Sequence, residues 1–220
     1  MIIVCPFDCN SRVPSHAGTD RIWPLLLRGL PFTSFDRSDG VIIPYLLENT
    51  VRNSRHSTDL VIGGDHSLTY FVLKGLCSRY GHINVVHFDA HHDSYQNSGL
   101  NNYTVFFHAA RLLPISIYSV GYRYDTPHVS PVLEREVAGP VYISLDVDYF
   151  DPSIITQVGH AVHCERDAIC NLATYESSIN KIAGPVVGCD LVEWHGAPEN
   201  SNEFNFIQKI LHTLLRVIQR

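Results

Sequence analysis

Two segments of this chain place carboxylates and imidazoles directly after apolar runs. Residues 87–93 read HFDAHHD and residues 144–148 read SLDVD, and each follows a run with the composition of a buried strand. A carboxylate at the end of a core strand costs free energy unless it is paired or binds a cation. A divalent metal ion is the simplest single partner for so many oxygen and nitrogen donors. The two segments therefore predict a metal-dependent protein.

Two further polar segments follow apolar runs in the same way. Residues 63–67 read GGDHS and residues 190–195 read DLVEWH. In an open parallel sheet, ligands bind outside the carboxyl ends of the strands, where all four segments would meet. Because alternate residues of an extended segment point the same way, we expect the candidate metal ligands to converge there. These candidates are His66, Asp89, His91, Asp93, Asp146 and Asp148.

The charge of this donor set indicates how many cations it needs. Its four aspartates at −1 each give −4, with both histidines neutral, and two divalent ions would balance that charge. Carboxylate and imidazole donors without thiolate suit Mn²⁺, Fe²⁺ or Zn²⁺, and the oxygen-rich set favours two Mn²⁺ ions. Two adjacent ions can activate a water molecule near neutral pH. Glu193 adds a further negative charge, so we expect a cationic substrate.

The elements that must position these residues alternate along the chain. Continuous apolar runs are typical of parallel strands covered on both faces, and apolar residues at three- and four-residue spacing indicate helices. The predicted strands are Ile2–Cys5, Leu60–Ile62, Ile83–Phe88, Ile115–Val120, Val141–Leu145 and Val186–Cys189. The predicted helices are Ile42–Val51, Leu68–Arg79, Val105–Leu112, Arg166–Lys181 and Phe204–Ile218. This alternation predicts an α/β domain with a mostly parallel central sheet.

Composition argues against several other classes of protein. The 220 residues are 45% hydrophobic, which suits one folded domain over residues 1–220. The net charge of −6 and the lack of a basic patch argue against a nucleic-acid partner. No apolar run approaches the roughly 20 residues that span a bilayer, and the first residues lack a secretory signal pattern. The six cysteines form no C-x-x-C pair, so we expect reduced thiols in a cytoplasmic protein without membrane contact.

The four polar segments, taken in order, resemble the signature of the ureohydrolase family, which comprises the arginases, the agmatinases and their relatives. GGDHS, DAHHD, SLDVD and DLVE lie between residues 63 and 193, and each follows a predicted strand. The resemblance implies an arginase-like three-layer sandwich in a single domain. It also implies hydrolysis of a guanidino group to urea and an amine, with two Mn²⁺ ions ahead of Fe²⁺ or Zn²⁺.

The resemblance further implies a role for each candidate. One ion would be held by His66, Asp89, Asp93 and Asp146, and the other by Asp89, His91, Asp146 and Asp148. Asp89 and Asp146 would bridge the two ions. Asp93 would also pass a proton to the leaving nitrogen. Glu193 would hold the guanidinium, because a carboxylate matches its planar N–H donors.

Two departures from the family's pattern concern the proton path and the substrate. Asn102 occupies the place of the family's proton-shuttle histidine, and an asparagine cannot relay a proton at neutral pH. The candidates for that role are His108, His92, His195 and solvent. Where free-arginine enzymes bind the amino acid's carboxylate and amine, this chain has Ser94 and Tyr95. We expect Tyr95 and Asn102 to contact the substrate.

The length of the chain bears on the same question, since it is shorter than typical arginases. We therefore expect loops over the substrate's amino-acid end to be missing, which would admit a guanidinium carried by something large. This is similar to the peptide arginases, which convert arginine residues of ribosomally made precursor peptides to ornithine. A precursor peptide is preferred as partner over a small guanidino substrate such as free arginine or agmatine.

Two other functions remain open at this point. Metal-dependent deacylases share the fold, although they usually use one metal ion and the second His-Asp set argues against them. A metal-loaded protein that binds a guanidinium or a peptide without turnover would explain the absent shuttle histidine. The oligomeric state is left open. Of the thirteen histidines, His87 is expected to be a satisfied core residue and His92 a packing residue, and His160 receives no role.

Overall fold

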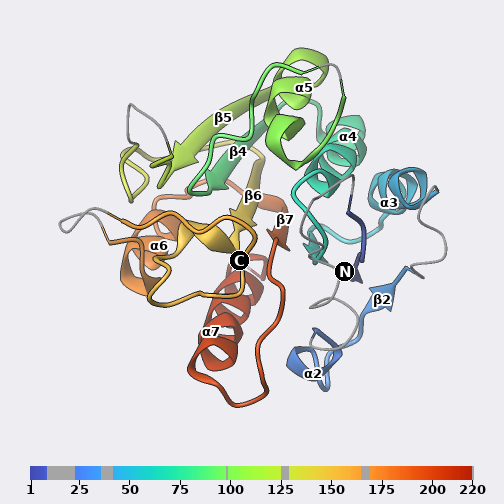
Figure 1. The fold of residues 1–220 in the computed structure, drawn as a ribbon. Helices are drawn as coiled ribbons and strands as arrows, with labels where there is room; N and C mark the ends of the chain where they lie inside the picture. Colours follow the sequence, from blue (N-terminus) through green and yellow to red (C-terminus); the bar gives the residue numbers. More distant parts are fainter. Residues whose placement is uncertain (9–22, 36–41, 98, 125–128, 165–168, 220) are drawn as a thin grey trace.

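The central element of the computed structural model is one parallel β-sheet (Figure 1). The structure describes residues 1–8, 23–35, 42–97, 99–124, 129–164 and 169–219. The sheet has the strand order β2-β1-β3-β7-β6-β4-β5, and every neighbouring pair is parallel. The strands are β1 (Ile2–Val4), β2 (Thr33–Ser34), β3 (Asp59–Ile62), β4 (Ile83–Phe88), β5 (Ile115–Val120), β6 (Val141–Asp146) and β7 (Val186–Val192).

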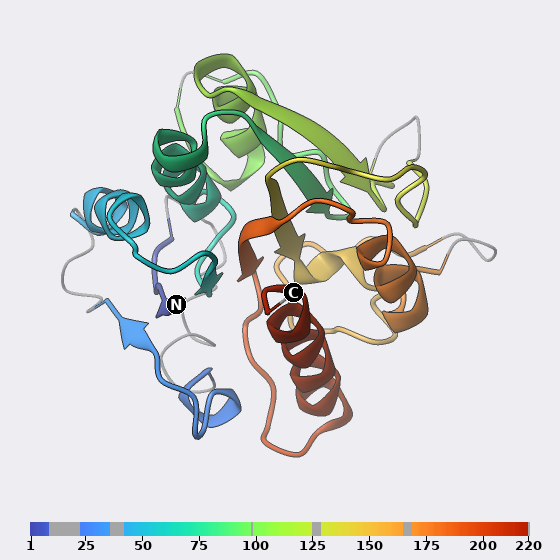
Figure 2. The ribbon, with the colours of Figure 1, turned by 180° about the vertical axis from the view of Figure 1, so that it is seen from behind.

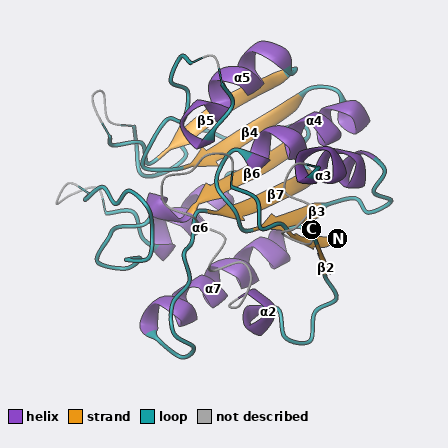
Figure 3. Ribbon diagram, turned by 45° about the vertical axis from the view of Figure 1, so that its right-hand side comes forward, coloured by secondary structure: helices purple, strands orange, loops and turns teal. Residues whose placement is uncertain are grey.

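Helices cover both faces of the sheet and make three layers (Figures 2 and 3). The first group is α3 (Ile43–Arg52), α4 (Leu68–Tyr80) and α5 (Val105–Leu112). The second group is α2 (Trp23–Leu26), α6 (Leu172–Ile179) and α7 (Asn202–Val217). Each group packs its buried apolar side chains into a separate core against its own face of the sheet. The predicted three-layer α/β sandwich with a mostly parallel central sheet is confirmed.

The two cores explain why the strands read as continuous apolar runs. In β3, Leu60 and Ile62 pack with α2 and α7, whereas Val61 between them packs with α3 and α4. Successive side chains of a strand point to opposite faces, so a strand buried on both faces has no polar side to alternate with. All residues of β3 and β6 are buried. The core therefore holds the carboxyl ends of the central strands at fixed positions.

Most predicted elements are present, with small shifts at their ends. Four of the predicted helices are present as α3, α4, α5 and α7, and α5 has the predicted bounds. The helix expected over Arg166–Lys181 is α6, which begins at Leu172 because Asn171 caps its first turn and ends at Ile179; residues 166–168 of the expected range lie outside the described part. β2 and α2 were not predicted, since each is only a few residues long. The extent of one domain over residues 1–220 stays a prediction.

The loops after the central strands carry the polar segments. Gly64 follows β3 with φ of 76°, and a Cβ at this position would overlap the carbonyl oxygen of Phe7. Only glycine combines this backbone conformation with such a close approach. The four segments meet at the carboxyl ends of the strands, as the strand-end argument predicted.

Among the described helices, none combines the length and the apolar character needed to cross a bilayer.

Candidate metal centre

The structure brings the six candidate ligands together at the carboxyl ends of β3, β4 and β6. Two sets of donor atoms are compact, with every atom of a set within 4.8 Å of the others. The first set comes from His66, Asp89, Asp93 and Asp146, and the second from Asp89, His91 and Asp148. Asp89 belongs to both sets, as the resemblance implied for a bridging residue. Asp146, expected in both, is grouped with the first set alone.

His66 is the focus of the first set. Its Nδ1 atom lies 2.9 Å from Asp93 Oδ2, 3.2 Å from Asp89 Oδ2 and 3.4 Å from Asp146 Oδ2. The ring is fully buried, and Nδ1 has no hydrogen-bond partner of acceptable geometry. A buried ring nitrogen facing three carboxylate oxygens without a hydrogen bond is the arrangement that a divalent cation would complete. The residues present therefore fit a metal ion at this position.

His91 and Asp148 form the second set with the other oxygen of Asp89. His91 Nδ1 lies 2.8 Å from Asp148 Oδ2 and 3.5 Å from Asp89 Oδ1. The remaining oxygen of Asp148 accepts a hydrogen bond from the backbone of Ala90 at 3.0 Å. This bond links the segment after β6 to the segment after β4, so the two donor sets are held side by side.

Tight turns, rather than an extended chain, make the aspartates converge. Asp89 Oδ1 accepts a hydrogen bond from the backbone N–H of His91 at 2.6 Å, and Asp146 Oδ1 accepts one from Asp148 at 2.9 Å. Each aspartate side chain thus closes a turn with the backbone two residues further on, as aspartate commonly does. The expectation of an extended backbone did not include such turns. Asp93 has φ of 46°, in the left-handed region. The expected convergence occurs, but the expected extended backbone was wrong.

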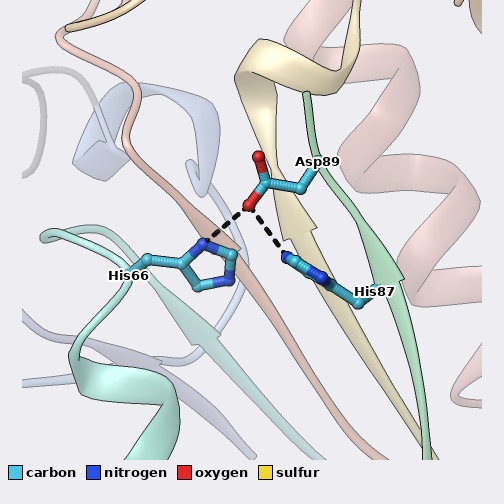
Figure 4. Close-up of side chains that lie close together, drawn as sticks. All are labelled: His66, His87 and Asp89. Carbon is cyan, nitrogen blue, oxygen red and sulfur yellow. Dashed lines mark hydrogen bonds and ion pairs between the residues drawn. The ribbon is translucent and has the colours of Figure 1, made fainter. Parts of the chain in front are cut away.

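Hydrogen bonds behind the donors fix their orientation. The far ring nitrogen of His66, Nε2, lies 2.9 Å from the Ser144 hydroxyl, which donates to Asp190 Oδ1 at 3.0 Å. On the other side, His87 Nε2 lies 2.8 Å from Asp89 Oδ2 (Figure 4). The expectation that His87 is a satisfied core histidine is confirmed. Such outer contacts orient metal-binding side chains and influence their affinity.

Burial and crowded negative charge change the proton affinity of these carboxyls. Burial, followed by the charge of Asp89, raises the pKa of Asp93 to about 7. Burial, followed by the charges of Asp65 and Asp93, raises the pKa of Glu193 to about 8. Burial and the charge of Asp148 also raise the pKa of Asp146 well above its usual value. Without a cation the site therefore retains protons, and a bound cation would replace them.

Glu193 and Asn102 line the narrow pocket beside the donors. The pocket holds about 10 Å³ of free space and is lined by His91, Asp93, Asn102, Tyr103, Asp146, Asp148, His160 and Glu193. Glu193 Oε1 accepts hydrogen bonds from the backbone N–H of His66 at 3.0 Å and from Asn102 Nδ2 at 3.3 Å. The left-handed backbone of Glu193, with φ of 65°, directs its side chain here after β7 ends.

The structure keeps the other predicted site residues outside this lining. Tyr95 is exposed and packs against His92, with ring centroids 4.3 Å apart and planes tilted by 49°. His108 lies on α5 and packs edge-on against Phe107, so its proposed proton relay gains no support from the geometry. His92 accepts a hydrogen bond from the backbone of Ser94, in agreement with a packing role.

Three residues near the site were missed from the sequence. Tyr103 and His160 line the pocket, and Arg123 lies buried beneath it. The Arg123 guanidinium donates to the carbonyl oxygens of Asp148 at 2.7 Å and Tyr149 at 3.0 Å, which steadies the turn after β6. No motif marks these three. Only the position of Arg123 shortly after the end of a predicted strand could have drawn attention to it.

Comparisons with known proteins agree with this geometry. The model of the arginase family matches residues 43–138. The agmatinase of Serratia proteamaculans is 31% identical over 61% of this chain and 51% of its own length. The mitochondrial arginase of Medicago truncatula is 30% identical over 62% of this chain and 48% of its own length. The chain spans about half the length of these curated relatives, and it is similar to members of the arginase, or ureohydrolase, family.

Solved structures show the same fold. Arginase from Medicago truncatula superposes with a TM-score of 0.82 at 19% identity, covering 99% of this chain and 86% of that chain. Proclavaminate amidino hydrolase from Streptomyces clavuligerus gives a TM-score of 0.75 at 19% identity, covering 99% of this chain and 90% of that chain. The resemblance to this family that the four polar segments indicated is confirmed.

Proposed function

We propose that this protein is a binuclear metal-dependent hydrolase that converts a guanidino group to urea and an amine. The observation that carries the proposal is the pair of donor sets that share Asp89 beside an acidic pocket. The likeness to agmatinases and arginases supports the same reaction class. A single-metal deacylase would need only one of the two donor sets.

Two divalent cations are the cofactors in this proposal, with Mn²⁺ first and Fe²⁺ or Zn²⁺ as alternatives. His66, Asp89, Asp93 and Asp146 would hold one cation, and Asp89, His91 and Asp148 the other. Bound there, the pair would supply Lewis acidity and activate water for attack on the guanidinium carbon. The buried Nδ1 of His66, facing three carboxylates, supports a cation at the first position.

The protein's own groups would bind the substrate and move its protons. Glu193 would accept N–H donors of the guanidinium, and Asn102 would keep the Glu193 carboxylate oriented through its amide. Asp93 would accept a proton from the attacking water and pass it to the leaving nitrogen, since its carboxylate lies in the pocket lining. In this assignment Asn102 serves as a positioning residue and carries no proton.

The substrate of the proposal is an arginine side chain within a peptide. Among the described residues that line the pocket, none is lysine or arginine, while Asp93, Asp146, Asp148 and Glu193 are acidic. A free arginine would bring its own carboxylate toward this negative group without a cation to receive it. Peptidyl arginine and agmatine lack that carboxylate. This charge argument disfavours free arginine alone; a precursor peptide stays the proposed partner because of the loops expected to be missing, with agmatine or free arginine as the alternative.

The test is release of urea by the Mn²⁺-loaded protein from three substrates measured in parallel. These are an arginine-containing peptide, agmatine and free arginine. Urea from the peptide, with a mass loss of one CN₂H₂ unit per converted arginine, supports the full proposal. Urea from a small substrate alone would keep the reaction and change the substrate. No urea from any of the three would overturn the proposed reaction.

A pair of variants tests the role of Glu193. Glu193→Gln should retain the metal ions but lose most urea release, because the amide presents a neutral face to the guanidinium. Glu199→Gln is the matched control, since Glu199 is exposed six residues further along the chain. Wild-type turnover by Glu193→Gln would contradict the substrate assignment.

A further inference from the structure

We infer that Tyr103 and His160 form an aromatic entrance whose rings contact the guanidinium-bearing side chain of the substrate. This contact would help the site to prefer a guanidinium over an ammonium group. This inference rests on the proposed function of the same site. Both residues line the pocket that holds Glu193 and the metal-donor side chains. They come from segments separated by more than fifty residues, so their meeting is a property of the fold and of no local motif.

The two rings lie close together in the lining of the pocket. Their centroids are 5.8 Å apart and their planes meet at 75°, an edge-to-face pair. His160 also meets the His91 ring edge-on at 6.5 Å. The His160 side chain is exposed and Tyr103 is partly buried, which places the pair between solvent and the acidic floor. Because both rings belong to the lining of a narrow pocket, a side chain bound there would lie within reach of them.

Both segments are anchored, so the rings keep their positions. Tyr103 lies in the 3₁₀ helix Asn102–Thr104, where Asn101 caps the backbone and Tyr95 N–H donates to the Tyr103 carbonyl at 3.0 Å. On the N-terminal side of His160, the backbone is held by a hydrogen bond from His195 N–H to the Gln157 carbonyl oxygen at 2.9 Å. On the C-terminal side of His160, the backbone N–H of Cys164 donates a hydrogen bond to the Asp151 carboxylate at 3.1 Å.

The chemistry of the pair matches a planar cation. A guanidinium binds the electron-rich face of an aromatic ring, and it stacks better than a compact ammonium because it is flat and weakly hydrated. The carboxylates of the pocket attract the positive charge, and Glu193 matches the planar N–H donors of a guanidinium. Stacking of the guanidinium on the free face of one of the two rings would strengthen the preference for a planar cation. The entrance should therefore favour guanidinium over ammonium side chains on chains of equal length.

Substitutions of His160 separate stacking from any other role of its ring. His160→Phe keeps an aromatic face and should keep KM within about twofold of wild type. His160→Ala removes the face and should raise KM about tenfold, with kcat changed far less. His163→Ala is the matched control, because His163 is exposed in the same segment and lies outside the pocket lining. Tyr103→Phe and Tyr103→Ala should behave as the corresponding His160 variants.

The kinetic test uses agmatine and an arginine-containing peptide with the Mn²⁺-loaded protein. Calorimetric affinity for agmatine is measured in parallel, so the entrance is tested even where no urea is released. Weaker agmatine binding by His160→Ala, with normal binding by His160→Phe and His163→Ala, supports the inference. Equal affinity for all variants would overturn it while leaving the proposed hydrolysis intact. A loss of kcat in His160→Phe would also overturn it, because the ring would then serve in proton transfer.

Discussion

The hydroxyl of Ser144 lies 2.9 Å from Nε2 of His66, the ring nitrogen that does not face the carboxylates. Since the Ser144 hydroxyl donates to Asp190, it accepts its own hydrogen bond from His66, which places the ring proton on Nε2. Burial alone would lower the pKa of the His66 ring, but Asp146, Asp89 and Asp93 raise it well above its usual value, so Nδ1 holds a proton until a cation takes its place and leaves the Nε2–H tautomer. This tautomer is the one that a metal ion requires at Nδ1.

Removing the Ser144 hydroxyl should weaken metal binding without removing a donor. In Ser144→Ala the His66 ring loses the acceptor that fixes its tautomer, so we expect metal affinity to fall about 10- to 100-fold. Calorimetric titration of the metal-free protein with Mn²⁺ measures the change. Ser78→Ala, on the exposed face of α4, is the control and should bind as the wild type. Unchanged affinity in Ser144→Ala would remove the support for the tautomer argument.

Metal stoichiometry should differ between variants of the shared and unshared donors. Asp89 contributes to both donor sets, so Asp89→Ala should bind no metal tightly, whereas His91→Ala should retain one ion per chain. His92→Ala is the matched control for the neighbouring position and should bind two ions. Elemental analysis after gel filtration counts the ions. Two ions in Asp89→Ala would show that the two sets do not form one binuclear centre.

The metal-free protein should lose stability as pH rises from about 4 to about 8. Asp93 and Glu193 have pKa values raised to about 7 and about 8 in the folded state, so the folded state binds more protons than the unfolded state in this range. Burial lowers the pKa of His91, but Asp148 raises it by more, so His91 adds to the loss of stability above pH 6.5. Burial lowers the pKa of His87, and this shift opposes the loss. Melting temperatures across this range should decline, and saturating Mn²⁺ should abolish the decline.

Arg123 should matter for stability more than an exposed arginine does. Its guanidinium donates to the backbone carbonyls of Gly121, Asp148, Tyr149, Phe150 and Val162. A lysine has one ammonium group and cannot reach all of them, so Arg123→Lys should cost about 2–4 kcal/mol in the free energy of unfolding. Arg216→Lys is the exposed control, with an expected change below about 0.5 kcal/mol. Denaturant unfolding measures both.

The sequence could predict the layers of the fold because each central strand is buried on both faces. The continuous runs at Ile83–Phe88 and Ile115–Val120 became β4 and β5 with the same bounds. It could also predict which donors meet, since Asp89 and Asp146 each end a strand of one parallel sheet. It could not predict β2, because two exposed residues carry no periodicity.

The entrance to the site depends on contacts that leave no pattern in the sequence. His160 is one of thirteen histidines, and nothing near it distinguishes it from His163. Its place beside Tyr103 follows from hydrogen bonds at Asp151 and Gln157 that join distant segments. His108 was one of the proton relays that the sequence left open, beside His92, His195 and solvent. Helix α5 instead turns its side chain toward Phe107.

The position of β7 between β3 and β6 has a consequence for the order of assembly during synthesis. Asp59–Ile62 and Val141–Asp146 have no direct pairing with each other, so a ribosome-bound chain that ends before Val186 holds two separate half-sheets. His66 then belongs to one half and Asp89 and Asp146 to the other. The first donor set can form only after β7 has inserted, and metal uptake would therefore report completion of the sheet.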